Sequence, residues 1–160
     1  MSLEYDVYIH DKRWNSVLKN NHVLYQLAYN IDLTLNTFDN EYTVSLNFVN
    51  DTSIQLLNKE YHNKDSPTNV LSLLYFSDTN SARAKEPLGD VFVSFDTITA
   101  EAKIFKVDFH NHFMHMLLHG TLHILGFDHV NNSDAKIMED IESTIMTNML
   151  GIDPYKTHML

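Results

Sequence analysis

Cysteine is absent from the sequence, and long apolar runs are absent too. The lack of cysteine among the 160 residues excludes disulfides and thiolate metal ligands, and leaves histidine and carboxylate as the strong zinc ligands. No segment approaches the roughly 18 consecutive apolar residues of a membrane helix. The first residues, Met1 to Asp6, have neither the basic nor the apolar region of a secretion signal. We therefore expect no membrane association and a cytoplasmic location.

Positive charge is scarce. Eleven Lys and Arg face 21 Asp and Glu, which gives a formal net charge of −10. This balance argues against a protein that grips long nucleic acid through many phosphate contacts. Three small basic clusters remain, and each forms either a local basic rim or ordinary solvated surface: Lys59 with Lys64, Arg83 with Lys85, and Lys103 with Lys106.

The remaining composition is that of one ordinary folded domain. The hydrophobic share of 44% and charged share of 20% are typical of globular proteins. A chain of this length buries a sizeable core but is too short to make two domains the expectation. We predict a single domain over residues 1–160.

Hydrophobic periodicity divides the chain into strands and helices. Alternating apolar residues predict strands near Leu3–Ile9 and 44–48. Between them, a three- and four-residue spacing predicts one long helix from Asp11 to Asp32. Asp51, Thr52 and Ser53 are candidate N-caps for the next helix.

The second half adds two strands and three helices. A strand runs to Phe76, a polar loop covers Thr79 to Pro87, and a strand follows over 88–94. Helical spacing then recurs three times, ending with a segment that Gly151 stops. The order predicts an α+β fold with a mixed four-stranded sheet covered by about five helices.

Three histidines close together in the sequence predict a metal site. His119 and His123 are four residues apart and so lie on one face of a helix, about 6 Å apart at Cβ. Gly126 can adopt a positive φ and end that helix, so that the chain returns and His129 faces the first two. Three imidazole nitrogens suit one zinc ion and leave a fourth position open, as catalytic zinc sites do.

Two further histidines share the same helix. His112 and His115 lie within about 80° of arc of His119 and His123, so His115 could pair with His119 on a metal. Neither has a returning third histidine. We therefore assign both to polar lining or surface.

The spacing His-x-x-x-His-x-x-Gly-x-x-His also occurs in metzincin proteases, which carry a glutamate general base after the first histidine. Gly120 occupies that position here. The substitution argues against peptide hydrolysis by the metzincin mechanism.

The stretch from His119 to His129 resembles the YbeY family of bacterial metal-dependent endoribonucleases, whose signature is His-Gly-x-Leu-His-x-x-Gly-Tyr-Asp-His. Ten of the eleven positions fit, with Phe127 in place of the tyrosine. The resemblance implies zinc, one ion per chain, held by His119, His123 and His129. It further implies cleavage of single-stranded RNA, with roles in ribosomal RNA maturation and ribosome quality control.

Two other segments also resemble the family. Leu57 to Ser72 is similar to a segment whose arginine belongs to the family's catalytic site, and His62 stands at that position. The resemblance therefore implies that His62 acts with His119 and His123 in catalysis, and that Lys64 lies on the substrate side. Leu88 to Ser94 resembles a family strand and contains Asp90.

Two carboxylates are candidates for supporting roles. Asp90 is either a substrate-side group or a residue at a strand edge. Asp128 either orients a ligand ring or shapes the turn.

We expect a hydrolase in which zinc activates water and polarises a phosphate oxygen, so that no carboxylate base is required. Two alternatives remain open. One is a metallopeptidase or amidohydrolase that uses another carboxylate as base. The other is a non-enzymatic ribosome-associated factor whose metal fixes the C-terminal fold.

Overall fold

One mixed sheet forms the centre of the molecule, which we describe from a computed structural model covering residues 2–75 and 86–156. The strand order is β1-β2-β4-β3. The strands are β1 (Leu3–Ile9), β2 (Tyr42–Val49), β3 (Val70–Leu74) and β4 (Pro87–Ser94). β1, β2 and β4 run parallel, whereas β3 pairs antiparallel with β4 and forms one edge of the sheet. The predicted α+β class with four strands is confirmed.

The described residues contain six helices. They are α1 (Trp14–Leu18), α2 (His22–Leu35), α3 (Asp51–His62), α4 (Phe95–Phe105), α5 (Phe109–Ile124) and α6 (Asn132–Leu150). The number exceeds our expectation of about five because the segment after Asp11 forms two helices. None of the helices within residues 2–75 and 86–156 combines the length and apolar character needed to cross a bilayer.

The break between α1 and α2 falls at Asn20 and Asn21, a residue type that commonly ends helices, and the apolar periodicity obscures it. Lys19 and Asn21 adopt φ of 48° and 62°, values that end a helix. Trp14 and Leu18 before the break, and Leu24 after it, are all buried in the same core. The apolar spacing therefore continues across the break, and periodicity alone predicts one helix.

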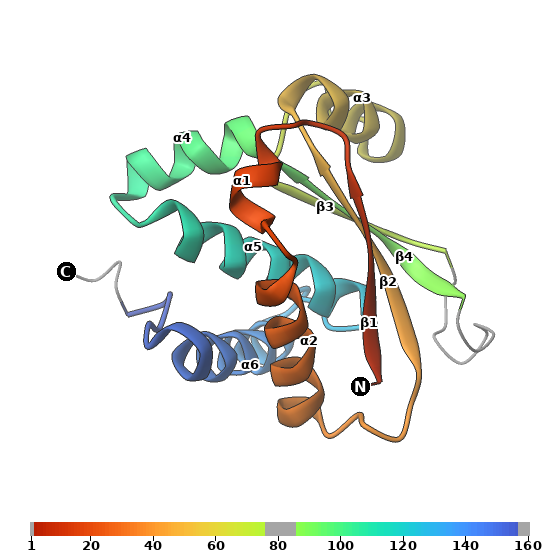
Figure 1. Cartoon of the computed structure of the whole chain (residues 1–160), viewed down its shortest axis with the longest axis vertical. Helices are drawn as coiled ribbons and strands as arrows, with labels where there is room; N and C mark the ends of the chain where they lie inside the picture. The colour runs from red at the N-terminus through yellow and green to blue at the C-terminus, as the bar shows by residue number, and fades with distance from the viewer. Residues whose placement is uncertain (1, 76–85, 157–160) are drawn as a thin grey trace.

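The helices cover the two faces of the sheet unequally (Figure 1). On one face, Leu46 and Phe48 of β2 belong to the main core together with Leu117 of α5 and Met146 of α6. On the other face, Ile54 of α3 forms a smaller core with strand residues that include Val49 and Leu71. The edge strand β3 thus lies between α3 on one side and α5 on the other.

Two details differ from expectation or lie outside it. The N-cap of α3 is Asn50, whose side chain accepts the Ser53 N–H at 3.0 Å, not one of the three residues after it. Asp51 instead accepts the hydroxyls of Ser94 and Thr97, both at 2.6 Å, and so ties α3 to the start of α4. The predicted polar loop falls mainly on residues 79–85, outside the described residues.

Candidate metal centre and cleft

Helix α5 presents the histidine motif, and both of its ends are defined locally. Asp108 caps its first turn by accepting the Asn111 N–H at 3.2 Å. Its apolar face, which includes Phe113 and Leu117, is fully buried. Toward the C-terminal end, Thr121 contacts the Tyr5 hydroxyl of β1 at 2.9 Å. These contacts fix the motif to the sheet independently of any bound ligand.

Gly120 allows α5 to approach β3 closely. A Cβ atom at this position would lie 2.7 Å from Val70 Cγ2 and 2.9 Å from Val91 Cγ1. The Gly120 carbonyl also accepts the Ser72 hydroxyl at 2.9 Å. The position that holds a glutamate base in metzincins is thus packed against the sheet, with no room for a side chain.

His119 and His123 direct the same ring nitrogen toward each other. The His119 Nδ1 donates to Glu142 Oε1 at 2.8 Å, and the His123 Nδ1 donates to the Phe127 carbonyl at 3.0 Å. Because both Nδ1 atoms are donors, both Nε2 atoms carry lone pairs. The two Nε2 atoms are 3.0 Å apart, close to the spacing of about 3.3 Å for two ligands of one tetrahedral zinc ion.

The chain returns after α5 as its sequence predicts. Gly126 has φ of +104°, and the Phe127 N–H bonds back to the Leu122 carbonyl at 3.0 Å. This turn brings His129 beside the two helical histidines, with ring centroids 5.6 Å from His119 and 5.1 Å from His123. One ligand nitrogen from each of the three lies within 4.8 Å of the others.

These residues fit a divalent metal ion. Two imidazole lone pairs that face each other at 3.0 Å repel one another, and a shared cation removes that repulsion. Burial, with the nearby His119, lowers the pKa of His123, which favours the neutral form that binds metal. Three imidazoles and no thiolate suit zinc, copper, iron or nickel better than calcium or magnesium.

Glu142 of α6 is a site residue that our sequence reasoning missed. Its side chain is fully buried and accepts from His119 Nδ1 through Oε1. A carboxylate on the far nitrogen of a metal-binding histidine fixes the ring and its tautomer. The available signal was an acidic residue within the apolar stripe of α6, next to Ile141 and three residues before Ile145.

His112 and His115 lie away from the three-histidine cluster. His112 is buried and its Nε2 is 2.9 Å from Glu101 Oε1. His115 Nε2 lies 3.4 Å from Glu142 Oε1 and is the buried side-chain atom that lacks a hydrogen-bond partner within the described ranges. Both line the interior of the helical layer, as the polar-lining assignment predicts.

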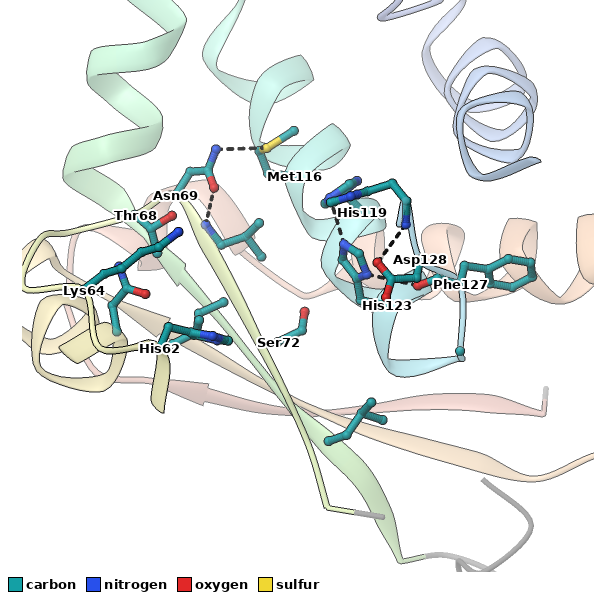
Figure 2. Close-up of a pocket in the computed structure, with 16 residues that line it drawn as sticks. His62, Lys64, Thr68, Asn69, Ser72, Met116, His119, His123, Phe127 and Asp128 are labelled. Atoms are coloured by element: carbon teal, nitrogen blue, oxygen red, sulfur yellow. Dashed lines mark hydrogen bonds between the residues drawn. The ribbon is translucent and has the colours of Figure 1, made fainter. Parts of the chain in front are cut away.

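A cleft of about 710 Å³ opens in front of the histidines, and His62 and Lys64 line its other side. Figure 2 shows them across the cleft from His119 and His123. His62 is the last residue of α3, and its position follows from where that helix ends. The structure thus brings the predicted catalytic histidine into the same cleft as the predicted metal ligands.

Amide side chains shape the wall that carries Lys64. The side-chain amide of the buried Asn58 donates to the Ser66 carbonyl at 2.9 Å, and the Asn58 backbone carbonyl accepts the Lys64 N–H at 3.2 Å. Asn69, at the start of β3, donates to Glu101 and accepts the Val70 N–H at 2.6 Å. These contacts hold the turn between α3 and β3 against the cleft.

The two candidate carboxylates, Asp128 and Asp90, lie in different places: only Asp128 is at the cleft. Asp128 lines the cleft, and its Oδ1 accepts the His129 N–H at 2.7 Å, so it shapes the turn; the rings of His119 and His123 are held by Glu142 and Phe127. Asp90 is not brought to the cleft. It bonds Asn47 and Tyr75 on the sheet face opposite α5.

One of the three basic clusters contributes to the cleft. Lys64 lines it, whereas its neighbour Lys59 lies 3.9 Å from Asp65. Lys103 and Lys106, near the end of α4, are exposed and do not line the cleft. Arg83 and Lys85 lie outside the described residues. The described part of the chain therefore contributes little basic surface to the site.

Comparison with known proteins gives one family. A family model described as endoribonuclease YbeY matches residues 8–150. A Rhizobium etli protein named endoribonuclease YbeY is 42% identical over 113 residues, which cover 71% of this chain and 66% of that protein, just under two thirds of its length. A Neorickettsia sennetsu protein of the same name is 37% identical over 144 residues, which cover 90% of this chain and 96% of that protein.

A solved structure supports the fold. The solution structure of a Thermotoga maritima protein superposes with a TM-score of 0.60 at 19% identity, covering 92% of this chain and 90% of that one. The family match spans every described element from α1 to α6 and includes the three convergent histidines. The chain belongs to the endoribonuclease YbeY family.

Proposed function

We propose that this protein is a zinc-dependent endoribonuclease that cleaves single-stranded RNA. The observation that carries the proposal is the convergence of His119, His123 and His129 at one side of an open cleft. Relatives named endoribonuclease supply the reaction class, which is hydrolysis of phosphodiester bonds within RNA. We further propose ribosomal RNA as the substrate, in 3′-end maturation of the small-subunit RNA and in ribosome quality control in the cytoplasm, as the resemblance of the His119–His129 motif implies.

The three histidines would hold the ion, and Glu142 and the Phe127 carbonyl would hold two of their rings. When bound, zinc supplies a Lewis acid for a phosphate oxygen and acidifies water near neutral pH, so a carboxylate base is not required. This agrees with Gly120, where the packing leaves no space for such a base.

His62 and Lys64 would bind the phosphate from the opposite wall. Lysine in general offers a positive charge to a phosphate, and a histidine ring offers hydrogen-bond donors. Both residues line the cleft, so an RNA backbone placed between the walls meets positive charge on the side away from the histidines. Asp128 lies at the rim and would disfavour additional phosphates near the turn.

Charge and shape support unpaired RNA as the substrate. The net charge of −10 and the one lysine that lines the cleft among residues 2–75 and 86–156 provide few of the phosphate contacts that duplex binding needs. A splayed single strand can enter a cleft of this size. Sequence-specific protein contacts to RNA also favour unstacked, unpaired segments.

The test combines metal analysis with RNA cleavage. Purified protein is assayed on a single-stranded RNA and on the same RNA annealed to its complement, with His123→Ala as the matched variant. We expect about one metal per chain, faster cleavage of the single strand, and loss of both metal and cleavage in the variant. Equal rates on the two substrates overturn the single-strand preference. RNA binding without cleavage, with global unfolding on chelation, would support a non-enzymatic factor instead.

One observation favours peptide cleavage as a second candidate. β3 is the edge strand of the described sheet and lines the cleft through Val70, Leu71 and Ser72. A free strand edge beside a metal site can align an extended peptide by strand addition. Casein cleavage that disappears in His123→Ala would support this candidate, and metal-loaded protein without activity on casein excludes it.

A further inference from the structure

A buried carboxylate connects the candidate metal centre to the end of the chain. Glu142 of α6 is fully buried. Its Oε1 accepts from His119 Nδ1 at 2.8 Å, and its Oε2 accepts a short hydrogen bond from the Tyr155 hydroxyl. One side chain thus contacts a predicted metal ligand and the segment that follows α6.

Three side chains surround the buried carboxylate. Its Oε1 lies 2.8 Å from His119 Nδ1 and 3.4 Å from His115 Nε2, and its Oε2 accepts from the Tyr155 hydroxyl. A buried polar group costs free energy when it loses a hydrogen-bond partner. The carboxylate therefore favours the arrangement in which His119 and Tyr155 both face it.

The segment 153–156 is docked by several contacts of its own. Ser143 of α6 donates to Asp153 Oδ1 at 2.9 Å, and the same oxygen accepts the Tyr155 N–H at 3.0 Å. The Tyr155 ring meets His115 edge to face, with centroids 5.5 Å apart. Pro154 is buried. These contacts place the Tyr155 hydroxyl at Glu142.

We propose that Glu142 is a positioning residue for His119, and that through Tyr155 it makes the docked segment 153–156 part of the metal site. This inference rests on the metal centre of the proposed function. It adds that a residue 36 positions beyond His119 in the sequence, with no contact to the ion itself, sets the affinity for metal.

The coupling must act in both directions. If docking of Tyr155 favours the His119 orientation that binds metal, metal binding favours docking of Tyr155 by the same factor. A contact that only stabilises the fold is linked to metal through global unfolding alone, so zinc would then slow exchange across the protein and not selectively in segment 153–156. Metal affinity and protection of the segment are therefore two independent measurements of one coupling.

The first experiment measures zinc affinity of the full-length protein by competition with a chromophoric chelator. Glu142→Gln keeps the shape of the side chain but removes its charge, and we expect affinity to fall roughly 10- to 100-fold. Tyr155→Phe removes only the hydroxyl, and we expect a loss of roughly two- to tenfold. Asp140→Asn, which removes an exposed charge from the same helix, and Tyr25→Phe, which alters an exposed tyrosine of α2, are the matched controls.

The second experiment measures hydrogen exchange of residues 153–156 with and without zinc. We expect zinc to slow exchange in the parent, and to slow it less in Glu142→Gln and Tyr155→Phe. If Glu142→Gln does not fold, as judged by circular dichroism, Tyr155→Phe alone decides the result.

The outcomes separate the two proposals. A parent protein that binds no zinc overturns the metal centre itself. A parent that binds zinc, with both variants binding it as tightly as Asp140→Asn and with exchange unaffected by zinc, overturns the coupling and leaves the metal centre standing.

Discussion

Gly120 and Val70 are in closer contact than any residue with a Cβ would permit. The Cβ of an alanine at position 120 would lie 2.7 Å from Val70 Cγ2, inside normal contact distance. The glycine sits between the two helical histidines in sequence, so the depth at which α5 packs against β3 also sets the position of both imidazoles. Packing and metal geometry are thus linked at one residue.

We predict that Gly120→Ala destabilises the protein. Overpacking a core contact costs about 1–3 kcal/mol, and alanine recovers up to about 1 kcal/mol over glycine inside a helix. Because Val70 is β-branched and stiff, we expect the cost of overpacking to exceed the gain in helix propensity. Urea unfolding measures the loss, and Val70→Ala in the same protein should restore part of it. If the Gly120→Ala variant is as stable as the parent, α5 can shift away from the sheet at no cost, and the prediction is wrong.

The second prediction concerns the number of histidines that hold metal. His119→Ala, His123→Ala and His129→Ala should each lose bound metal, because all three nitrogens are needed around one ion. His115→Ala should retain about one metal per chain, because its Nε2 faces Glu142 and not the cluster. Elemental analysis of the purified variants measures this. Metal lost from His115→Ala but kept in His129→Ala would reverse the assignment.

The third prediction concerns stability in acid. Hydrogen bonds from Arg13 lower the pKa of Asp11 to about 2 and also lower that of Asp96. Unfolded aspartates titrate near 3.9, so these contacts stabilise the fold above about pH 4 and are lost as pH falls toward 2. The urea midpoint should therefore fall over this range. Arg13→Gln should flatten the decrease, whereas Lys12→Gln, which removes a neighbouring exposed charge, should leave it unchanged.

The sequence predicts the metal cluster well because its geometry is local. His119 and His123 share a helix, and Gly126 and His129 follow within six residues. Helix periodicity and the conformational freedom of glycine suffice to bring the three rings together. The same holds for β1 and β2, whose sequences alternate between apolar and polar residues.

Features that depend on contacts between residues far apart in the sequence could not be predicted from local spacing. Glu142 meets His119 across 23 residues, and no spacing rule connects two helices before their packing is known. Asp90 has the residue type of a site carboxylate, but strand register places it on the opposite face of the sheet. The α1–α2 break is set by Lys19 and Asn21. Asparagine commonly ends a helix, but the apolar spacing that continues across the break favoured one helix.

The last prediction concerns His62, which stands where the family carries an arginine and lines the cleft opposite the metal cluster. Histidine assists a phosphate as a cation only while it is protonated, whereas arginine stays charged and forks onto two oxygens. We expect His62→Arg, whose charge is permanent and whose fork fits a phosphate, to cleave RNA faster than the parent. His62→Ala should lose activity while keeping its zinc, measured by RNA cleavage and by metal analysis. Tyr61→Phe, at the exposed neighbouring position, is the control. An unchanged rate in His62→Arg, together with full activity in His62→Ala, would show that His62 takes no part in catalysis.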